Sequence, residues 1–401
     1  MSPGSTLITR RSQTFTLFWI LSERCQLACR YCYVRNPDRD TVMSSDTAER
    51  SVEFIANEPL YSDYDTLCFH FTGGEPLLQI ELIEEITEMG LNKLEAGQHR
   101  WHNSFKVAIT TNGILYDDPR VQRYIERYKN LLSVSVTLDG TRQKHDSQRV
   151  FADGRGSYGQ VKRILPLWLQ QFPGAGTKMT VSVDTLDLIA DSVIEIWESG
   201  VTINSIALAH QPGWERADPS VLESQLKRLA DYLVRNRLQC SKKHGLSFFS
   251  SLIGKPLPRD DGYGFCGAGK RYLAVDPLGK LYACSMLLPS IVGSRIDRSV
   301  GDCWRGLDTN RLRPYRIINR RDQCGSECLI CSIANGCYWC PAINCDLSTF
   351  DSLFDKPVYQ CDLHRAIASA NRYLGELSKN QGATVTAGAG QPDLEAPSSI
   401  G

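Results

Sequence analysis

Six strand-then-helix units follow one another between residues 14 and 236, and this alternation constrains the fold more than any other feature of the sequence. Runs rich in β-branched and aromatic residues alternate with segments whose apolar residues recur at helical spacing. The strand-like runs are 15–21, 66–71, 105–111, 132–138, 178–183 and 205–209, and the helical segments are 46–57, 80–94, 119–127, 158–171, 188–198 and 220–237. Repeated units of this kind predict an α/β fold with a parallel sheet and right-handed crossovers.

Six units are fewer than the eight that close a TIM barrel, so we expect an open, TIM-like partial (β/α)6 barrel. Ligands of such folds bind on loops at the carboxyl ends of the strands. The pattern divides the chain into a flexible N-terminus (1–13), a barrel domain (14–250), a cysteine-rich domain (251–378) and a disordered Gly-, Ala-, Pro- and Ser-rich tail (379–401). A Gly- and Pro-rich linker is expected at 254–267 and a last helix at 364–377.

The charge balance excludes some partners. Lys and Arg total 45, as do Asp and Glu, so nothing favours electrostatic capture of nucleic acid or anionic lipid. No apolar run approaches the ~20 residues of a membrane span, and residues 1–13 lack the apolar core of a signal peptide. We therefore expect a cytoplasmic protein that binds neither nucleic acid nor membrane.

Fifteen unevenly placed cysteines are the second constraint. Three lie within residues 25–32 and ten within 266–361. In a reducing compartment, clustered cysteines bind metal more often than they form disulfides. Because periodicity fades after residue 246, we expect the second cysteine-rich stretch to have little regular structure and to fold around metal rather than around a large apolar core.

The trio Cys25, Cys29 and Cys32 directly follows the first predicted strand. Three thiolates on one loop can hold three irons of a 4Fe–4S cluster and leave the fourth iron open to a small ligand. A zinc site is the alternative, but zinc prefers four ligands, and the next cysteine, Cys68, lies inside a predicted strand. The spacing therefore favours a cluster with one open iron.

The run Cys25-Gln-Leu-Ala-Cys29-Arg-Tyr31-Cys32 resembles the signature of the radical S-adenosylmethionine (SAM) superfamily, including the aromatic residue before the last cysteine. The resemblance implies that SAM chelates the open iron through its amino and carboxylate groups. One electron then cleaves SAM to a 5′-deoxyadenosyl radical. The three cysteines are accordingly expected to form the catalytic centre, with Tyr31 close to the cofactor.

Polar motifs follow the next three strands, where ligand contacts are expected. Gly73-Gly74-Glu75-Pro76 is similar to the glycine-rich motif whose backbone receives the SAM amino group, although a Gly-Gly turn by itself is ordinary. The resemblance implies further SAM contacts from Thr111, Asn112, Thr137 and Asp139, with Thr137 where the superfamily commonly has serine. Arg149 is either the partner of the SAM carboxylate or a solvated surface arginine.

The later cysteines resemble the SPASM extension, which carries two auxiliary 4Fe–4S clusters in many radical SAM enzymes that act on peptides. The resemblance assigns Cys266, Cys284 and Cys340 to one cluster and Cys328, Cys331, Cys337 and Cys361 to the other, for three 4Fe–4S clusters in all. Cys340 comes one residue earlier than in the common pattern, so Cys345 is its rival. No cysteine just upstream completes the first set, which predicts an open iron for a substrate thiolate. Cys303, Cys324 and Cys345 stay unassigned, and structural zinc sites are the alternative for this block.

Several segments resemble more closely the ranthipeptide-type maturases that target peptides with repeated Cys-x-x-x motifs. They are 137–150, 154–158, 225–232, 266–270, 336–344 and 361–373. The resemblance implies thioether links from a cysteine sulfur to a non-alpha carbon of a ribosomally made Cys-rich precursor peptide, with flavodoxin or ferredoxin as electron donor. The alternatives are a carbon–carbon cross-link, the Ser or Cys oxidation of sulfatase maturation, and a non-catalytic, zinc-stabilised binding module.

Recognition of the peptide is expected to use surfaces beyond the N-terminal segment. Only 24 residues precede Cys25, so we expect no separate leader-binding domain there. The barrel, the SPASM domain or another protein is then expected to hold the peptide. Gln211 and Trp214, after the last barrel strand, either face the peptide or pack on the sheet.

Overall fold

The computed structural model describes residues 13–35, 37–38, 40–211, 213–257, 266–292, 296–317, 325–347, 351–354 and 356–380. The predicted flexible N-terminus and disordered tail lie almost entirely outside the described residues. Cys324 and most of the predicted linker lie outside them as well.

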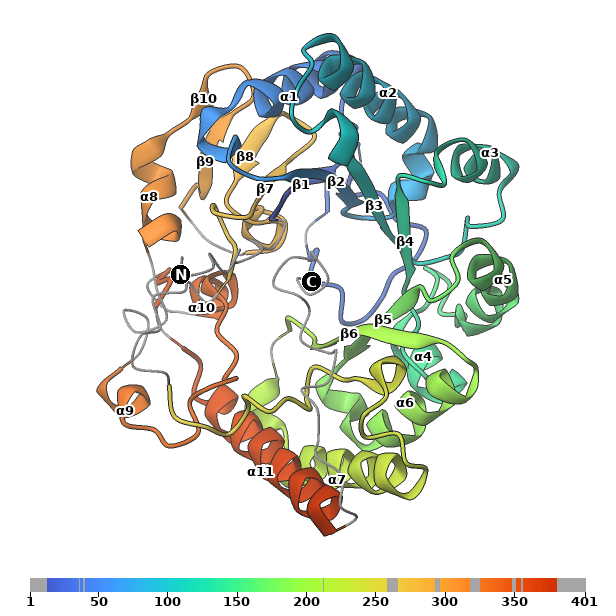
Figure 1. The fold of residues 1–401 in the computed structure, drawn as a ribbon, viewed down its shortest axis with the longest axis vertical. Helices are drawn as coiled ribbons and strands as arrows, with labels where there is room; N and C mark the ends of the chain where they lie inside the picture. The colour runs from blue at the N-terminus through green and yellow to red at the C-terminus, as the bar shows by residue number, and fades with distance from the viewer. Residues whose placement is uncertain are drawn as a thin grey trace, which may run out of the picture.

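Six parallel strands form the barrel (Figure 1). They are β1 (Thr14–Ile20), β2 (Thr66–Thr72), β3 (Lys106–Thr111), β4 (Leu132–Val136), β5 (Gly176–Val181) and β6 (Thr202–Leu208). The strands β1 to β4 pair in chain order, and β5 pairs with β6. One bridge, between Thr137 and Lys178, joins the two sheets. The predicted open (β/α)6 barrel is confirmed.

Helices follow the strands and cover the outside of the sheet (Figure 1). They are α1 (Ser45–Asn57), α2 (Ile80–Ala96), α3 (Pro119–Tyr128), α4 (Arg142–Gln148), α5 (Tyr158–Gln171), α6 (Ile189–Glu198) and α7 (Pro219–Arg235). The helices α3 and α7 begin at a proline behind an aspartate N-cap, a combination that satisfies the first free N–H groups. The short, polar α4 was not predicted, because seven residues give no clear helical period.

The cysteine-rich region is more regular than its sequence predicts. Its strands β7 (Tyr272–Val275), β8 (Lys280–Tyr282), β9 (Ser299–Asp302) and β10 (Gly306–Leu307) extend the barrel sheet beyond β1. Its helices are α8 (Thr309–Ile317), α9 (Ser326–Leu329), α10 (Pro341–Leu347) and α11 (Tyr359–Asn380). The expectation of little regular structure is therefore wrong, because strands of two to four residues are too short to show a period of two. The last helix also begins earlier than predicted and includes Cys361.

Apolar packing joins this region to the barrel. Leu273, Val275 and Leu281 are fully buried in the same core cluster as Phe15 and Trp19 of β1. The expectation that this region lacks an apolar core is wrong for its β7–β9 part, because pairing with β1 buries these strands.

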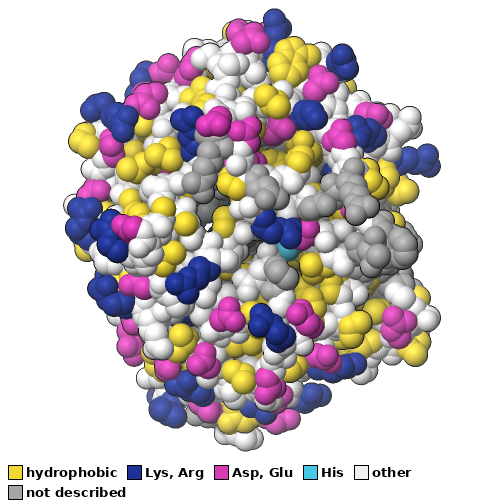
Figure 2. Space-filling model, turned by 180° about the vertical axis from the view of Figure 1, so that it is seen from behind, with side chains coloured by type: hydrophobic (Ala, Val, Ile, Leu, Met, Phe, Trp, Pro, Cys, Tyr) yellow, Lys and Arg dark blue, Asp and Glu magenta, His cyan; other side chains and the backbone are white. Residues whose placement is uncertain are grey.

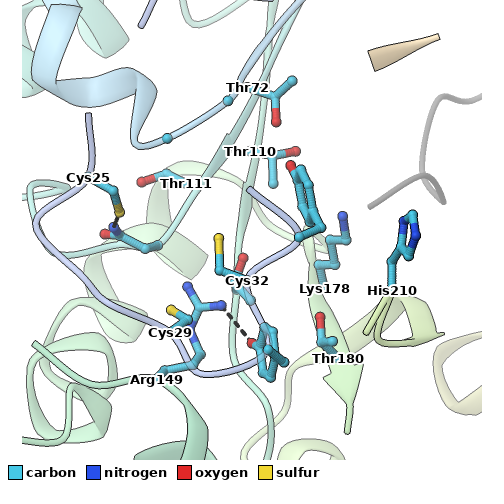
Figure 3. Close-up of a pocket in the computed structure, with 16 residues that line it drawn as sticks. Cys25, Cys29, Cys32, Thr72, Thr110, Thr111, Arg149, Lys178, Thr180 and His210 are labelled. Atoms are coloured by element: carbon cyan, nitrogen blue, oxygen red, sulfur yellow. Dashed lines mark hydrogen bonds between the residues drawn. The ribbon is translucent and has the colours of Figure 1, made fainter. Parts of the chain in front are cut away.

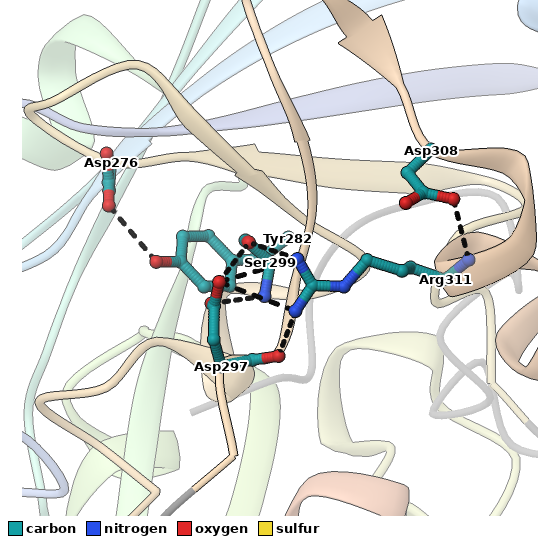
Figure 4. A network of polar contacts seen from close by, with 6 residues as sticks. All are labelled: Asp276, Tyr282, Asp297, Ser299, Asp308 and Arg311. Atoms are coloured by element: carbon teal, nitrogen blue, oxygen red, sulfur yellow. Dashed lines mark hydrogen bonds and ion pairs between the residues drawn. The ribbon is translucent and has the colours of Figure 1, made fainter.

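Polar contacts reinforce the β7–β10 region (Figure 4). The Asp276 carboxylate accepts hydrogen bonds from the backbone of Leu278 and Lys280, both at 2.9 Å, and from the Tyr282 hydroxyl at 3.2 Å. This arrangement fixes the turn between β7 and β8. On the other side, Arg311 of α8 donates to Ser299 at 3.2 Å and joins the helix to β9.

The surface carries both signs of charge. In Figure 2, Lys and Arg side chains are interspersed with Asp and Glu across the whole face, in agreement with the balanced composition. None of the described helices is long and apolar enough to cross a membrane.

The last helix packs along α7 on the outside of the barrel (Figure 1). Leu226, Leu229 and Leu233 of α7 are buried in the core, as is Leu374 of α11. Two polar contacts at 2.8 Å, from Ser369 to Glu223 and from Tyr373 to Asp231, fix the relative position of the helices. This contact attaches the end of the cysteine-rich region to the barrel.

Replacing Leu226 with alanine should therefore destabilise the protein. A fully buried leucine truncated in this way typically costs about 2–5 kcal/mol of the free energy of unfolding. Urea denaturation followed by far-UV circular dichroism measures the change. The matched control is Leu278→Ala, where the side chain is 60% exposed and the expected change is under about 0.5 kcal/mol. Equal effects of the two substitutions would contradict the packing described here.

Candidate active site

A pocket of about 110 Å³ opens where the barrel strands end (Figure 3). Every strand contributes, either with a residue near its carboxyl end or with the loop that follows, as expected for this fold. The residues singled out from the sequence that line it are Cys25, Cys29, Tyr31, Cys32, Gly73, Gly74, Thr111, Asn112, Thr137 and Arg149. Glu75, Pro76 and Asp139 do not line the pocket, and Pro76 begins a short 3-10 helix (Pro76–Gln79).

The three N-terminal cysteines share this pocket on the loop after β1. Burial, followed by the charge of Glu75, raises the pKa of Cys25 to about 12. Burial also raises the pKa of Cys29, against the opposing charge of Arg149, and the nearby Cys32 raises it further. Because these surroundings disfavour free thiolates, ionisation of the trio calls for a positive partner such as iron.

Backbone groups hold the trio in place. The N–H of Leu27 donates to Cys25 Sγ at 3.4 Å, and the N–H of Cys32 donates to the Cys29 carbonyl at 3.0 Å. Throughout the described part of the chain, no three His, Cys, Asp or Glu side chains converge on the position of a single metal ion. The trio instead surrounds a pocket, which is the arrangement that a cluster requires.

The glycine pair after β2 packs directly against the segment that leads to Cys25. Gly73 has φ +124°, and a Cβ on Gly74 would lie 2.1 Å from the Arg24 carbonyl oxygen. Only glycine allows this approach. The same contact places the N–H of Glu75 2.7 Å from that carbonyl.

The Glu75 carboxylate connects two strand ends. It accepts hydrogen bonds from Thr111 Oγ1 at 2.7 Å, from the N–H of Asn112 at 2.8 Å and from the N–H of Leu77 at 3.1 Å. Burial raises the pKa of Glu75, and these hydrogen bonds oppose the rise. All three hydrogen bonds come from the protein itself, and they hold the Gly73–Pro76 motif against the end of β3.

Arg149 is buried and lies beside the trio. Its Nη1 donates to the Tyr31 hydroxyl at 2.8 Å, and that hydroxyl donates to Asp139. The alternative that Arg149 is a solvated surface arginine is therefore wrong, because α4 and the loop after it turn the side chain inward. Although burial alone would raise the pKa of Asp139, the charges of Lys144 and Arg149 hold it below its usual value. Nε of Arg149 has no hydrogen-bond partner among the described residues.

Six pocket residues were not predicted, and two of them, Lys178 and His210, carry titratable nitrogens (Figure 3). Lys178 lies on β5, and burial, followed by the charge of Arg149, lowers its pKa to about 8. His210 follows β6, and its Nε2 lies 2.9 Å from a carboxylate oxygen of Asp346. The only signal in the sequence was position: His210 directly follows one predicted strand, and Lys178 begins another. Trp214, which was predicted nearby, packs on the barrel, and its Nε1 donates to the Ala209 carbonyl at 2.8 Å. Gln211 is half-buried and does not line the pocket.

Cys266, Cys284 and Cys340 form one group in the C-terminal region. Burial raises the pKa of Cys284, and both other thiols raise it further. Burial is also the main cause that raises the pKa of Cys340 to about 11, with Cys266 contributing. Cys345 is 1% exposed inside α10 and contributes, as Cys284 does, to the raised pKa of Tyr315.

Cys328, Cys331, Cys337 and Cys361 form a second group. Burial raises the pKa of Cys337, which Cys361 and Cys328 also influence. Burial likewise raises the pKa of Cys328, with contributions from Cys361 and Cys331. A lysine, Lys356, lies among them with Nζ 2.5 Å from Cys337 Sγ. The thiols within each set thus lie within electrostatic range of one another.

Tyr33 relates the trio to the first C-terminal group. It lines the pocket, and its pKa is raised by burial and then by Cys32. Cys284 contributes to the same rise from the other side. One side chain is therefore within electrostatic range of both sets of thiols.

Comparison with known proteins agrees with this arrangement. Residues 19–189 match the model of the radical SAM superfamily. The radical SAM cyclopropyl synthase TigE of Paramaledivibacter caminithermalis is 21% identical over 281 residues, which are 66% of this chain and 56% of that protein. The matched region thus spans little more than half of this curated relative.

Two solved structures extend the similarity over most of the chain. The structure of anSMEcpe with bound AdoMet and Cp18Cys peptide has a TM-score of 0.63 at 18% identity and covers 92% of this chain and 99% of that one. Streptococcus suis SuiB bound to precursor peptide SuiA has a TM-score of 0.55 at 14% identity, over 86% of this chain and 76% of that one. At these identities the likeness is one of fold.

The barrel, its pocket and the superfamily match point to one class of protein. Residues 19–189 match the radical SAM superfamily. The fold of the whole chain is the α/β partial barrel seen in anSMEcpe, with an additional C-terminal region.

The contact between Gly74 and Arg24 gives a direct test of the pocket. Gly74→Ala should lower the free energy of unfolding by about 1–3 kcal/mol, because the new methyl group meets backbone that has no room to yield. The displaced loop carries Cys25, so iron retained per chain after reconstitution should fall as well. Gly375→Ala in α11, whose Cβ meets no atom within 4 Å, is the control and should be neutral or slightly stabilising. Unchanged iron content in Gly74→Ala would contradict the proposed role of the contact.

Proposed function

We propose that this chain is a radical SAM peptide maturase that installs thioether cross-links, from cysteine sulfur to a non-alpha carbon, in a Cys-rich precursor peptide. One observation carries the proposal: the cysteine trio opens on the barrel pocket while seven further cysteines form two groups in the attached region. The solved structures of similar fold include one with bound AdoMet and a peptide and one with a precursor peptide, which supports a peptide substrate.

The residues present fit the implied cofactors. Cys25, Cys29 and Cys32 would hold the cluster that binds SAM. The two C-terminal groups would hold the auxiliary 4Fe–4S clusters, with Cys340 rather than Cys345 in the group of three. When bound, SAM and its cluster supply a 5′-deoxyadenosyl radical that abstracts hydrogen from carbon. The first C-terminal group has three described thiols, which would leave one iron open to a substrate thiol.

The chain itself binds and orients SAM. The backbone after β2 can approach a ligand closely because Gly73 and Gly74 have no side chain. Arg149, whose Nη1 donates to Tyr31 and whose Nε has no partner among the described residues, would bind the SAM carboxylate by a charge-assisted hydrogen bond. Thr137, which lines the same pocket, would offer its hydroxyl to SAM.

Metal analysis of anaerobically reconstituted protein should give about twelve irons per chain with matching sulfide, the content of three 4Fe–4S clusters. Cys32→Ala, Cys340→Ala and Cys361→Ala should each lose about four irons, because each removes a ligand from a different cluster. Cys345→Ala is the control and should retain the full content. Loss of iron in Cys345→Ala but not in Cys340→Ala would make Cys345, rather than Cys340, the cluster ligand. Zinc without iron would refute the cluster proposal.

The peptide reaction is tested with anaerobic enzyme, SAM, dithionite and a synthetic peptide with Cys-x-x-x repeats. Each link should lower the peptide mass by two hydrogen atoms and remove one thiol from alkylation by iodoacetamide. The same mass loss in a product whose thiols all still react with iodoacetamide would indicate a carbon–carbon link instead. A peptide of unchanged mass, across a panel of such repeats, would contradict the maturase proposal.

A further inference from the structure

His210 has no assigned role in binding SAM, yet it is buried, lines the pocket and is hydrogen-bonded to a carboxylate. Its side chain is 5% exposed, lines the pocket and is held by a carboxylate. The Asp346 side chain that holds it is 2% exposed, and Arg35 binds its other oxygen at 2.5 Å. Asp346 lies on α10 and His210 lies after β6, so the pair spans the barrel and the C-terminal region.

The hydrogen bond fixes which ring nitrogen carries the hydrogen. A carboxylate accepts and cannot donate, so Nε2 of His210 is the N–H that points at Asp346. The neutral ring then has its lone pair on Nδ1. This Nδ1 is buried and has no hydrogen-bond partner among the described residues. A buried, unpartnered basic nitrogen beside an enzymatic pocket is the arrangement of a general base.

We propose that His210 is the general base that accepts the proton of the peptide cysteine thiol, and that Asp346 positions it. The inference rests on the proposed thioether chemistry and names the residue that activates the sulfur. A cysteine thiol has an ordinary pKa of about 8.5 and is mostly protonated at neutral pH. Bond formation to carbon requires that this proton leave, and the unpartnered Nδ1 of His210 would accept it.

The step balances as follows. The carbon loses a hydrogen atom, which ends in 5′-deoxyadenosine, and the thiol loses a proton to Nδ1. A carbon–sulfur bond forms, and one electron is released, which an auxiliary 4Fe–4S cluster would accept and return. Each link therefore removes two hydrogens from the peptide with SAM as the two-electron oxidant, and it yields methionine, 5′-deoxyadenosine and one proton. That proton is the one that His210 carries to solvent.

Other groups around the pocket suit this task less well. Tyr31 and Tyr33 are acids whose pKa burial raises, and the Glu75 carboxylate is occupied by three hydrogen bonds. His70 does not line the pocket, and burial lowers its pKa to about 3, which makes it a weak base.

The charges that face His210 support a thiolate. Asp346 and Arg35 lie behind it on the side of α10, and Lys178 of β5 lines the pocket with it, as do Arg149 and the trio. An ammonium group in a partly buried pocket stabilises a thiolate once the proton has moved to His210.

The test uses His210→Gln, whose side-chain amide can still donate to Asp346 but cannot accept a proton as a base. Reconstituted full-length enzyme is assayed anaerobically with SAM, dithionite and the Cys-x-x-x repeat peptide, and thioether and 5′-deoxyadenosine are measured in the same reaction. At pH 7 thioether formation should fall about 100-fold, the usual contribution of a general base. SAM cleavage and the KM for peptide should stay within about twofold. The variant should recover toward pH 9, where the peptide thiol ionises unaided.

Controls separate this inference from the proposal on which it rests. The exposed His102→Gln should behave as wild type throughout. Asp346→Asn should lower thioether formation less than His210→Gln does, because the base remains but loses its fixed tautomer. A wild-type pH profile in His210→Gln would overturn the inference while leaving the maturase proposal intact, as would a parallel loss of SAM cleavage, which marks a structural role. A wild-type enzyme that forms no thioether would refute both.

Discussion

The pairing of β1 with both β2 and β7 is the contact on which the rest of the structure depends. β1 pairs in parallel with β2 along its whole length and with β7 from Thr16 to Trp19. The loop after β1 carries the cysteine trio, whereas Cys266 precedes β7 and Cys284 follows β8. Backbone hydrogen bonds in one sheet therefore determine how far the trio lies from the first C-terminal group, and thiols of both groups raise the pKa of Tyr33. A rigid sheet is a suitable support for redox groups whose spacing must stay constant.

The pocket is built around buried charges that would be costly if left unpaired. Arg149, Tyr31 and Asp139 form a chain of hydrogen bonds, and Asp139 also accepts from the N–H of Thr180 at 2.8 Å on β5. The network thus connects the trio loop, the segment after β4 and β5. The unpartnered groups that remain, Nε of Arg149 and Nδ1 of His210, adjoin the pocket, where a ligand can satisfy them.

Much of the barrel could be predicted because its elements are long enough to show a period. Each of the six strands and their main helices lies within about three residues of its predicted range. The trio was predictable because its ligands are adjacent in sequence. By contrast, β7 to β10 have two to four residues each, and β7 depends on β1, more than 250 residues earlier in the chain. The local sequence around β7 contains no pattern that predicts its pairing with β1.

Contacts between distant residues are not visible in local spacing. Spacing left Cys340 and Cys345 as rivals; Cys340 immediately precedes α10, whereas Cys345 is buried within that helix. The pairing of His210 with Asp346 could not be predicted, because the two residues are 136 positions apart in the chain.

The short helix α10 connects the two proposals. Cys340 immediately precedes it, and Asp346 lies near its end. If Cys340 is a cluster ligand, the position of α10 is set at one end by the cluster and at the other by the hydrogen bond to His210. The orientation of the base then depends on a filled auxiliary site, since a shift of α10 would remove the acceptor that fixes the His210 tautomer. Sulfur activation and auxiliary-cluster assembly would in this way depend on the same seven-residue helix.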